Sequence, residues 1–191
     1  MEYSFREVRT EDAVYVADHI KADNLQELQA LRGGNVYNEL VASIRDSVVS
    51  GCCCIDGRPM ALYGLTRRNI MDSKYCVWLI LTDEAEKHKV FIGRQTKQVI
   101  QAIVRDFGVC GNTVNADNKS IIKWVKWLGG KLQGPFPYGI YGLPHYYFEF
   151  DQDILKEGYH GRRCNDWCDS AGRLFAGTCC KTTGAGTGKA G

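Results

Sequence analysis

The segment from Lys74 to Thr82 (KYCVWLILT) constrains the fold of this chain most, because it is apolar without alternation. A strand with that pattern is expected to be buried on both faces of a sheet. After a polar connection, apolar residues from Ile92 to Phe107 keep helical spacing, and Gly108 predicts the end of that helix. This strand and this helix therefore predict the centre of an α/β domain.

The residues before Lys74 predict strands and helices that flank this centre. Apolar spacing places three strands and two helices, in chain order, at residues 3–8 (strand), 10–20 and 36–44 (helices), and 48–55 and 60–66 (strands). Asp56-Gly57 supplies positive φ to a tight turn, so the two last strands should pair antiparallel. Residues 25–35, which contain Gly33-Gly34, are expected to form a loop.

The residues after the central helix predict one more helix and two strands. A strand at 109–115 and a helix at 121–128 come first; the irregular loop GPFPYGIYGLP then leads to a strand at 145–150. The order of elements predicts an α/β (α+β) domain over residues 1–154, with a mixed, mostly antiparallel sheet flanked by helices. Residues 155–191 lose apolar periodicity, and they are expected to be an irregular Cys/Gly-rich arm that only a partner orders.

Composition excludes several classes of protein. The chain of 191 residues has 24 basic and 22 acidic side chains and a net charge of +2, which gives no global reason to bind nucleic acid or an acidic membrane. No apolar run approaches the ~20 residues that span a bilayer, and the charged N-terminus is unlike a secretory signal. The nine cysteines are an odd number, so we expect reduced thiols in a cytosol.

Residues 118–130 (NKSIIKWVKWLGG) resemble the helix after the fifth strand of the GNAT acyltransferases. The positions in register are Asn118, Ile121, Ile122, Leu128 and Gly129. The resemblance implies an N-acetyltransferase fold in which acyl-CoA binds in a splay between the fourth and fifth strands. Val125 stands where that family often has a tyrosine that acts as general acid, and valine has no proton to donate.

The pyrophosphate loop of that family, Q/R-x-x-G-x-G/A, is absent before the central helix. If Gly93 is its second small residue, Phe91 takes the place of the first, and we expect its side chain to obstruct the approach of phosphates. The sequence therefore predicts no cofactor, with acetyl-CoA as the alternative. Lys89, Gly93, Arg94 and Asn118 are the candidate cofactor contacts, although basic residues at a helix start also occur as a solvated face.

Within the superfamily, residues 3–150 resemble a degenerate branch, the internal virion protein A family of short-tailed phages. The likeness is in FREVRTED, the hairpin DGRPMA, VWLILTD and the WVKWLGG helix. It implies a non-catalytic virion or assembly protein, made in the host cytoplasm and carried in the virion. Its partners would be other phage particle proteins or further copies of the chain. The alternative function is an acyl-CoA-dependent N-acetyltransferase.

Two groups of side chains are candidates for chemistry if the protein is active. Asp83 and Glu84 follow the central strand, where the family has a carboxylate that deprotonates the amine, but acids there also serve as loop solvation or helix N-terminal charges. The aromatic residues around the last loop and strand would border an acceptor groove or serve as packing; they are Tyr138, Tyr141, His145, Tyr146 and Tyr147.

The arm contains the only metal-like spacing in the sequence. His160, Cys164, Cys168 and Cys179 are candidate zinc ligands, and the alternatives are free thiols or intermolecular disulfides. Trp167, Leu174 and Phe175 are too few for a core, and we expect them to anchor the arm in a partner.

Overall fold

The computed structural model describes residues 2–67, 74–156, 173–174 and 178–179. It contains a seven-stranded sheet with the order β1-β2-β3-β4-β5-β7-β6. The strands are β1 (Tyr3–Arg6), β2 (Ser47–Ile55), β3 (Arg58–Arg67), β4 (Tyr75–Leu81), β5 (Cys110–Asn115), β6 (Lys131–Tyr138) and β7 (Leu143–Phe150). All neighbouring strands are antiparallel except β4 and β5, which are parallel.

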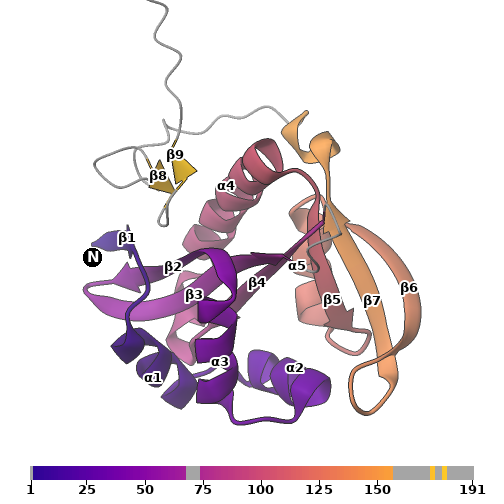
Figure 1. Cartoon of the computed structure of the whole chain (residues 1–191), viewed down its shortest axis with the longest axis horizontal. Coiled ribbons are helices and arrows are strands. Elements are labelled where there is room, and N and C mark those ends of the chain that lie inside the picture. The colour runs from indigo at the N-terminus through magenta and orange to yellow at the C-terminus, as the bar shows by residue number, and fades with distance from the viewer. Residues whose placement is uncertain (1, 68–73, 157–172, 175–177, 180–191) are drawn as a thin grey trace, which may run out of the picture.

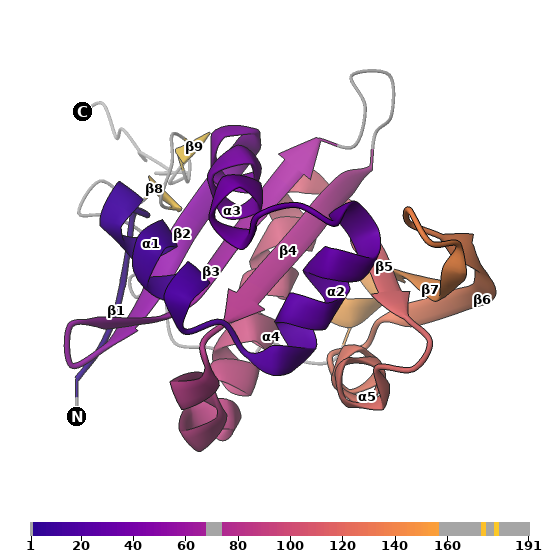
Figure 2. The same cartoon turned by 90° about the horizontal axis from the view of Figure 1, so that it is seen from below.

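Helices cover both faces of the sheet (Figures 1 and 2). They are α1 (Thr10–Asp18), α2 (Ala22–Arg32), α3 (Val36–Arg45), α4 (Lys89–Phe107) and α5 (Lys119–Trp127), with short 3₁₀ helices η1 (Asp83–His88) and η2 (Gln152–Leu155). α1, α2 and α3 lie on one face, and α4 and α5 lie on the other. Because α4 carries the chain from the end of β4 back to the start of β5, these two strands run parallel.

Each face has its own hydrophobic core. Between the sheet and the α4/α5 layer, Val104, Cys110 and Val114 are at most 1% exposed. On the opposite face, Val16 of α1 and Leu62 of β3 are fully buried. This two-sided burial explains the unalternated apolar pattern around β4, and the predicted fold class is confirmed.

The predicted hairpin between β2 and β3 is confirmed. Asp56 and Gly57 form its turn with φ values of 47° and 79°. The strands pair antiparallel from Ile55–Arg58 onward. A positive φ at both turn residues is the geometry for which an Asp-Gly pair is suited.

Residues 25–35 are not the loop that the sequence predicts, because α2 occupies most of them. The segment ADNLQELQALR contains good helix formers, but only Asn24 of α2 is fully buried. A helix that lies half-exposed has a weak apolar stripe, so periodicity does not reveal it. Gly33, with φ of 65°, is the left-handed cap at its end.

The predicted irregular loop GPFPYGIYGLP is also wrong over much of its length. Its first part belongs to β6, and its last residues begin β7. β6 is an edge strand with an irregularity in register between Gln133 and Phe136. Proline is tolerated at such an edge, because a missing N–H there need not break the ladder.

Beyond Lys156, the structure describes only two short strands of the predicted arm. β8 (Arg173–Leu174) and β9 (Thr178–Cys179) pair antiparallel. The division of the chain after residue 154 therefore stays a prediction. Within the described residues, no helix is long and apolar enough to cross a membrane.

Candidate functional site

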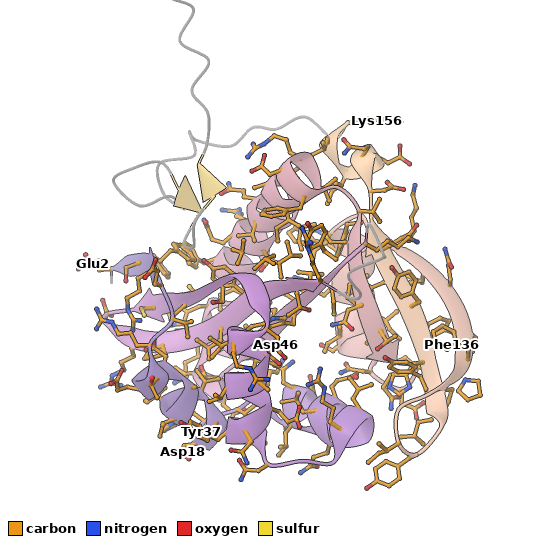
Figure 3. The ribbon with its side chains drawn as sticks, viewed as in Figure 1. Glu2, Asp18, Tyr37, Asp46, Phe136 and Lys156 are labelled. Atoms are coloured by element: carbon orange, nitrogen blue, oxygen red, sulfur yellow. The ribbon has the colours of Figure 1, made fainter. Side chains whose placement is uncertain are left out.

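The parallel strands β4 and β5 are paired at one end only. Two pairs of residues are in register, Tyr75 with Cys110 and Cys76 with Gly111. From there the strands separate toward their carboxyl ends, and the sheet opens between them (Figure 1). In Figure 3, Asp46 marks the half of the molecule that holds β2 and β3, and Phe136 marks the other half with β6.

Strand alternation turns the peptide groups of Leu79 toward this opening. The Thr82 N–H donates to the Met60 carbonyl of β3 at 3.0 Å, so even-numbered residues of β4 pair with β3. The N–H and C=O of Leu79 therefore point to the β5 side, where neither has a hydrogen-bond partner among the described residues. Nearby, the Asn112 side-chain amide donates to the Val77 carbonyl at 3.0 Å. Among the described residues, the opening thus presents the unpaired backbone donor and acceptor of Leu79.

Helix α2 bridges the two separated strands across the open end (Figure 2). The Asn24 Oδ1 accepts the Leu81 N–H of β4 at 3.0 Å. The Glu27 Oε1 accepts the Asn115 N–H of β5 at 3.1 Å and the Asn118 side-chain amide at 3.2 Å. Residues three apart share one face of a helix, so a single face of α2 contacts both strands.

The carboxyl group of Glu27 holds a proton more readily than an ordinary glutamate. Burial raises its pKa, because the charged form loses water. The hydrogen bonds from Asn115 and Asn118 and the charge of His145 lower that pKa, Asp23 raises it further, and the net pKa is raised. No lysine or arginine of the described residues lies within ion-pair distance of this carboxylate.

His145 lies beside this group on β7 but does not line the cavity. It is the register partner of Asn115 and is 0% exposed. Its Nδ1 lies 2.7 Å from the Leu143 carbonyl, so Nδ1 is the protonated nitrogen that donates. The Nε2 atom is buried and has no hydrogen-bond partner within the described residues. His145 therefore is not part of the cavity wall, where the sequence places it as one alternative; it lies behind Asn115 on the neighbouring strand.

The opening continues into a cavity of about 1240 Å³. Its walls come from α2, β4, β5, the start of α4, α5 and the β6–β7 hairpin. Three of the predicted cofactor contacts line it: Lys89, Gly93 and Arg94. Asn118 is not a lining residue; its Oδ1 accepts the Ile121 N–H at 3.1 Å and caps α5, while its amide donates to Glu27.

The first turns of α4 place two cations, Lys89 and Arg94, at the cavity. The Lys89 Nζ pairs with Glu86 at 3.3 Å, whereas Arg94 has no ion-pair partner among the described residues. A Cβ placed on Gly93 would lie 3.5 Å from the Trp127 ring, so this position has ordinary van der Waals spacing. Positive charge near the start of a helix favours the binding of anions.

Phe91 does not obstruct the cavity, and that sequence-based expectation is wrong. Its ring stacks on Tyr3 with a centroid distance of 3.6 Å, and it lies 6.3 Å from the ring of Phe5. Both of these residues belong to β1, and Phe91 does not line the cavity. The side chain turns toward the sheet edge because apolar neighbours there cover it.

The acids predicted as a general base lie away from the main cavity. Asp83 and Glu84 are in η1, where the Asp83 N–H donates to the His19 carbonyl at 3.0 Å. Glu84 borders a separate cavity of about 390 Å³ together with His88. A catalytic role for these acids stays a prediction. Val125 is 3% exposed and packs in the core beside α4.

The candidates in the arm cannot be placed. Outside the described residues lie His160, Cys164, Trp167, Cys168 and Phe175, while Leu174 and Cys179 are described only as members of β8 and β9. Their predicted roles in zinc binding and partner contact stay predictions. In the described part of the chain, no group of three or more His, Cys, Asp and Glu side chains could hold a metal ion.

Sequence reasoning missed Asn24, Glu27 and the free backbone of Leu79. The first two lie in the segment expected to be a loop, and Leu79 is an ordinary apolar residue of a strand. The one available signal was the spacing of Asn24 and Glu27, which puts two polar side chains on one face if the segment is helical.

No protein-family model and no curated protein matches the chain. Its structure matches that of an N-acetyltransferase from Staphylococcus aureus with a TM-score of 0.60, at 13% identity over 79% of this chain and 99% of that one. The match to AAC(6')-Ib in complex with ribostamycin and coenzyme A has a TM-score of 0.63, at 10% identity over 85% of this chain and 100% of that one. The match to the PaiA N-acetyltransferase of Thermoplasma acidophilum in complex with coenzyme A has a TM-score of 0.58, at 15% identity over 79% of this chain and 99% of that one. The chain therefore has the GNAT N-acetyltransferase fold.

These matches correct two expectations. The sequence favours a non-catalytic virion protein without a cofactor, and both parts of that interpretation are wrong. The three solved structures just described are acetyltransferases, and two of them contain coenzyme A. Beyond the GNAT fold, none of these matches supports the likeness to the phage family.

Proposed function

We propose that the protein is an acyl-CoA-dependent N-acetyltransferase whose acyl-CoA site is the opening between β4 and β5. The observation that carries this proposal is the early separation of these strands, which leaves the N–H and C=O of Leu79 unpaired at a large cavity. The pantetheine arm of coenzyme A contains amide groups, which are the natural partners of a free backbone donor and acceptor.

The residues at the start of α4 fit the phosphates of the same ligand. Arg94 is a cavity-lining cation without an ion-pair partner in the described residues, and Lys89 lies on the same wall. Phe91 packs on β1, so the backbone near Gly93 stays accessible from the cavity. Phosphates would therefore lie toward α4, and the reacting end would lie toward α2.

Bound acyl-CoA supplies a thioester, whose carbonyl carbon accepts an amine nitrogen. By holding the pantetheine arm at the Leu79 backbone, the chain positions the thioester next to it, and the apolar walls of β4 and α5 exclude water. Val125 has no proton to give, so the side chain at that position does not act as an acid.

Calorimetric titration with acetyl-CoA tests the proposal. We expect a dissociation constant near ~1 μM, or about −8 kcal/mol. Arg94→Glu should weaken binding by about 10-fold or more, since a charged hydrogen bond contributes ~1.5–3 kcal/mol. Lys126→Glu is the matched control, because Lys126 is exposed on α5 and does not line the cavity. Absence of binding at ~1 mM acetyl-CoA would refute the proposed function.

Other expectations from the sequence stay predictions beside this one. They are the location in a virion after synthesis in a host cytoplasm, contacts with other particle proteins, and assembly with further copies of the chain.

A further inference from the structure

Four carboxylates with different partners line the cavity: Asp23, Glu27, Asp46 and Glu86. The carboxylate of Glu86 pairs with Lys21 at 2.8 Å and with Lys89 at 3.3 Å. Lys21 also lies 3.5 Å from Asp23. The hydrogen bonds from Lys21 and Lys89 lower the pKa of Glu86, which makes it a poor base.

The two remaining carboxylates, Asp46 and Glu27, differ in whether a cation pairs with them. Asp46 is ion-paired with Arg45 at 2.9 Å, and both side chains are largely exposed. Glu27 has only neutral hydrogen-bond donors, namely the Asn115 N–H and the Asn118 amide. Its Oε2 has only a longer contact of 3.3 Å, shared with the Asn115 N–H, and so keeps capacity to accept another proton.

We infer that Glu27 is the group that takes the proton from the acceptor amine, an inference that rests on the proposed function. A general base works best when its pKa approaches the operating pH, and Glu27 is the cavity carboxylate without a cationic partner in the described residues. Asn24, on the same face of α2, holds the helix to β4 through Leu81. The bridge between the strands thus fixes the distance of Glu27 from the reacting end.

The surroundings of Glu27 define the class of substrate. Leu28 and Leu31 of α2 line the cavity together with Tyr138 and Ile140 of the β6–β7 hairpin. The hairpin tip touches the end of α2, since a Cβ on Gly139 would lie 2.6 Å from the Ala30 carbonyl oxygen. An acidic group among these apolar lining residues fits a primary amine on an aliphatic chain.

The proton balance of the reaction closes with these groups. The substrate ammonium gives one proton to the Glu27 carboxylate, and the free amine attacks the thioester carbonyl carbon. As the C–N bond forms and the C–S bond breaks, the second N–H proton goes to the sulfur that leaves. The products are an amide and a thiol, and Glu27 returns its proton to solvent.

Four neighbouring residues shift the pKa of the Glu27 carboxyl group in addition to its burial. Asp23 on α2 raises its pKa, and His145 on β7 lowers it, as do the donors Asn115 and Asn118. Because the folded-state pKa is raised, the charged form costs stability. The stability that the neutral form of Glu27 contributes to folding is therefore present below the unfolded pKa and is lost as the pH rises through the folded pKa.

Acetylation of hexylamine by the full chain, with the variant Glu27→Gln, tests the inference. The variant should bind acetyl-CoA within about 2-fold of the wild type but lose about 100-fold or more in kcat/KM, and the acid limb of its pH profile should disappear. Glu11→Gln is the matched control, because Glu11 is exposed on α1 and does not line the cavity. The control should retain wild-type kinetics.

A readout independent of turnover is the stability of the two proteins in urea. Relative to the wild type, Glu27→Gln should gain stability as the pH rises from ~4 to ~7, and the control should not.

Each other outcome is decisive. Failure to bind acetyl-CoA would refute the proposed function itself. Binding without acetylation of hexylamine would refute the substrate class. A Glu27→Gln variant with wild-type kcat/KM, or the loss appearing in Glu84→Gln instead, would refute the role of Glu27.

Discussion

Replacing Ile122 with alanine should destabilise the fold by about 3–4 kcal/mol. Ile122 lies on α5, is 8% exposed and belongs to the core that contains Ile100, Val104 and Phe150. The change removes three carbon groups, and their return to water alone costs about 2.4 kcal/mol at ~0.8 kcal/mol each. The cavity left behind adds to this cost, because the packed neighbours on α4 and β7 relax only in part.

Urea denaturation followed by circular dichroism measures this change. The midpoint should fall while the slope stays the same, since the surface exposed on unfolding is nearly unchanged. Lys123→Ala on the same helix is the control, because Lys123 is exposed and its loss should shift stability by less than ~0.5 kcal/mol. An unchanged midpoint for Ile122→Ala would mean that α5 does not pack on the sheet with this face.

Three further predictions concern charge and close packing. Burial raises the pKa of Asp12, but hydrogen bonds from Arg6 at 2.6 and 2.7 Å and from a backbone N–H lower it overall. Asp12→Asn should therefore cost stability at pH ~7 in urea titrations, and the difference should vanish as the pH falls through the lowered pKa. Gly111→Ala should cost ~1–3 kcal/mol or more, because its Cβ would lie 2.1 Å from the Phe148 carbonyl oxygen. Gly93→Ala, with ordinary spacing in a helix, should instead be neutral or stabilising by thermal melting.

The sequence by itself determined the central elements of the fold. The apolar β4, the striped α4 and the Asp56-Gly57 turn were predictable because each depends on local patterning: burial on both faces, a 3.6-residue period and positive φ. Local rules identify such residues without knowledge of their neighbours.

Only the tertiary structure decided the site. Whether Phe91 obstructs the cavity depends on the position of β1, which comes from the far end of the chain. Glu27 is a base candidate because α2 lies across the ends of β4 and β5, and 88 positions separate it from Asn115. Pairing between residues so distant in the chain is set by the packing of whole layers, and no local pattern encodes it.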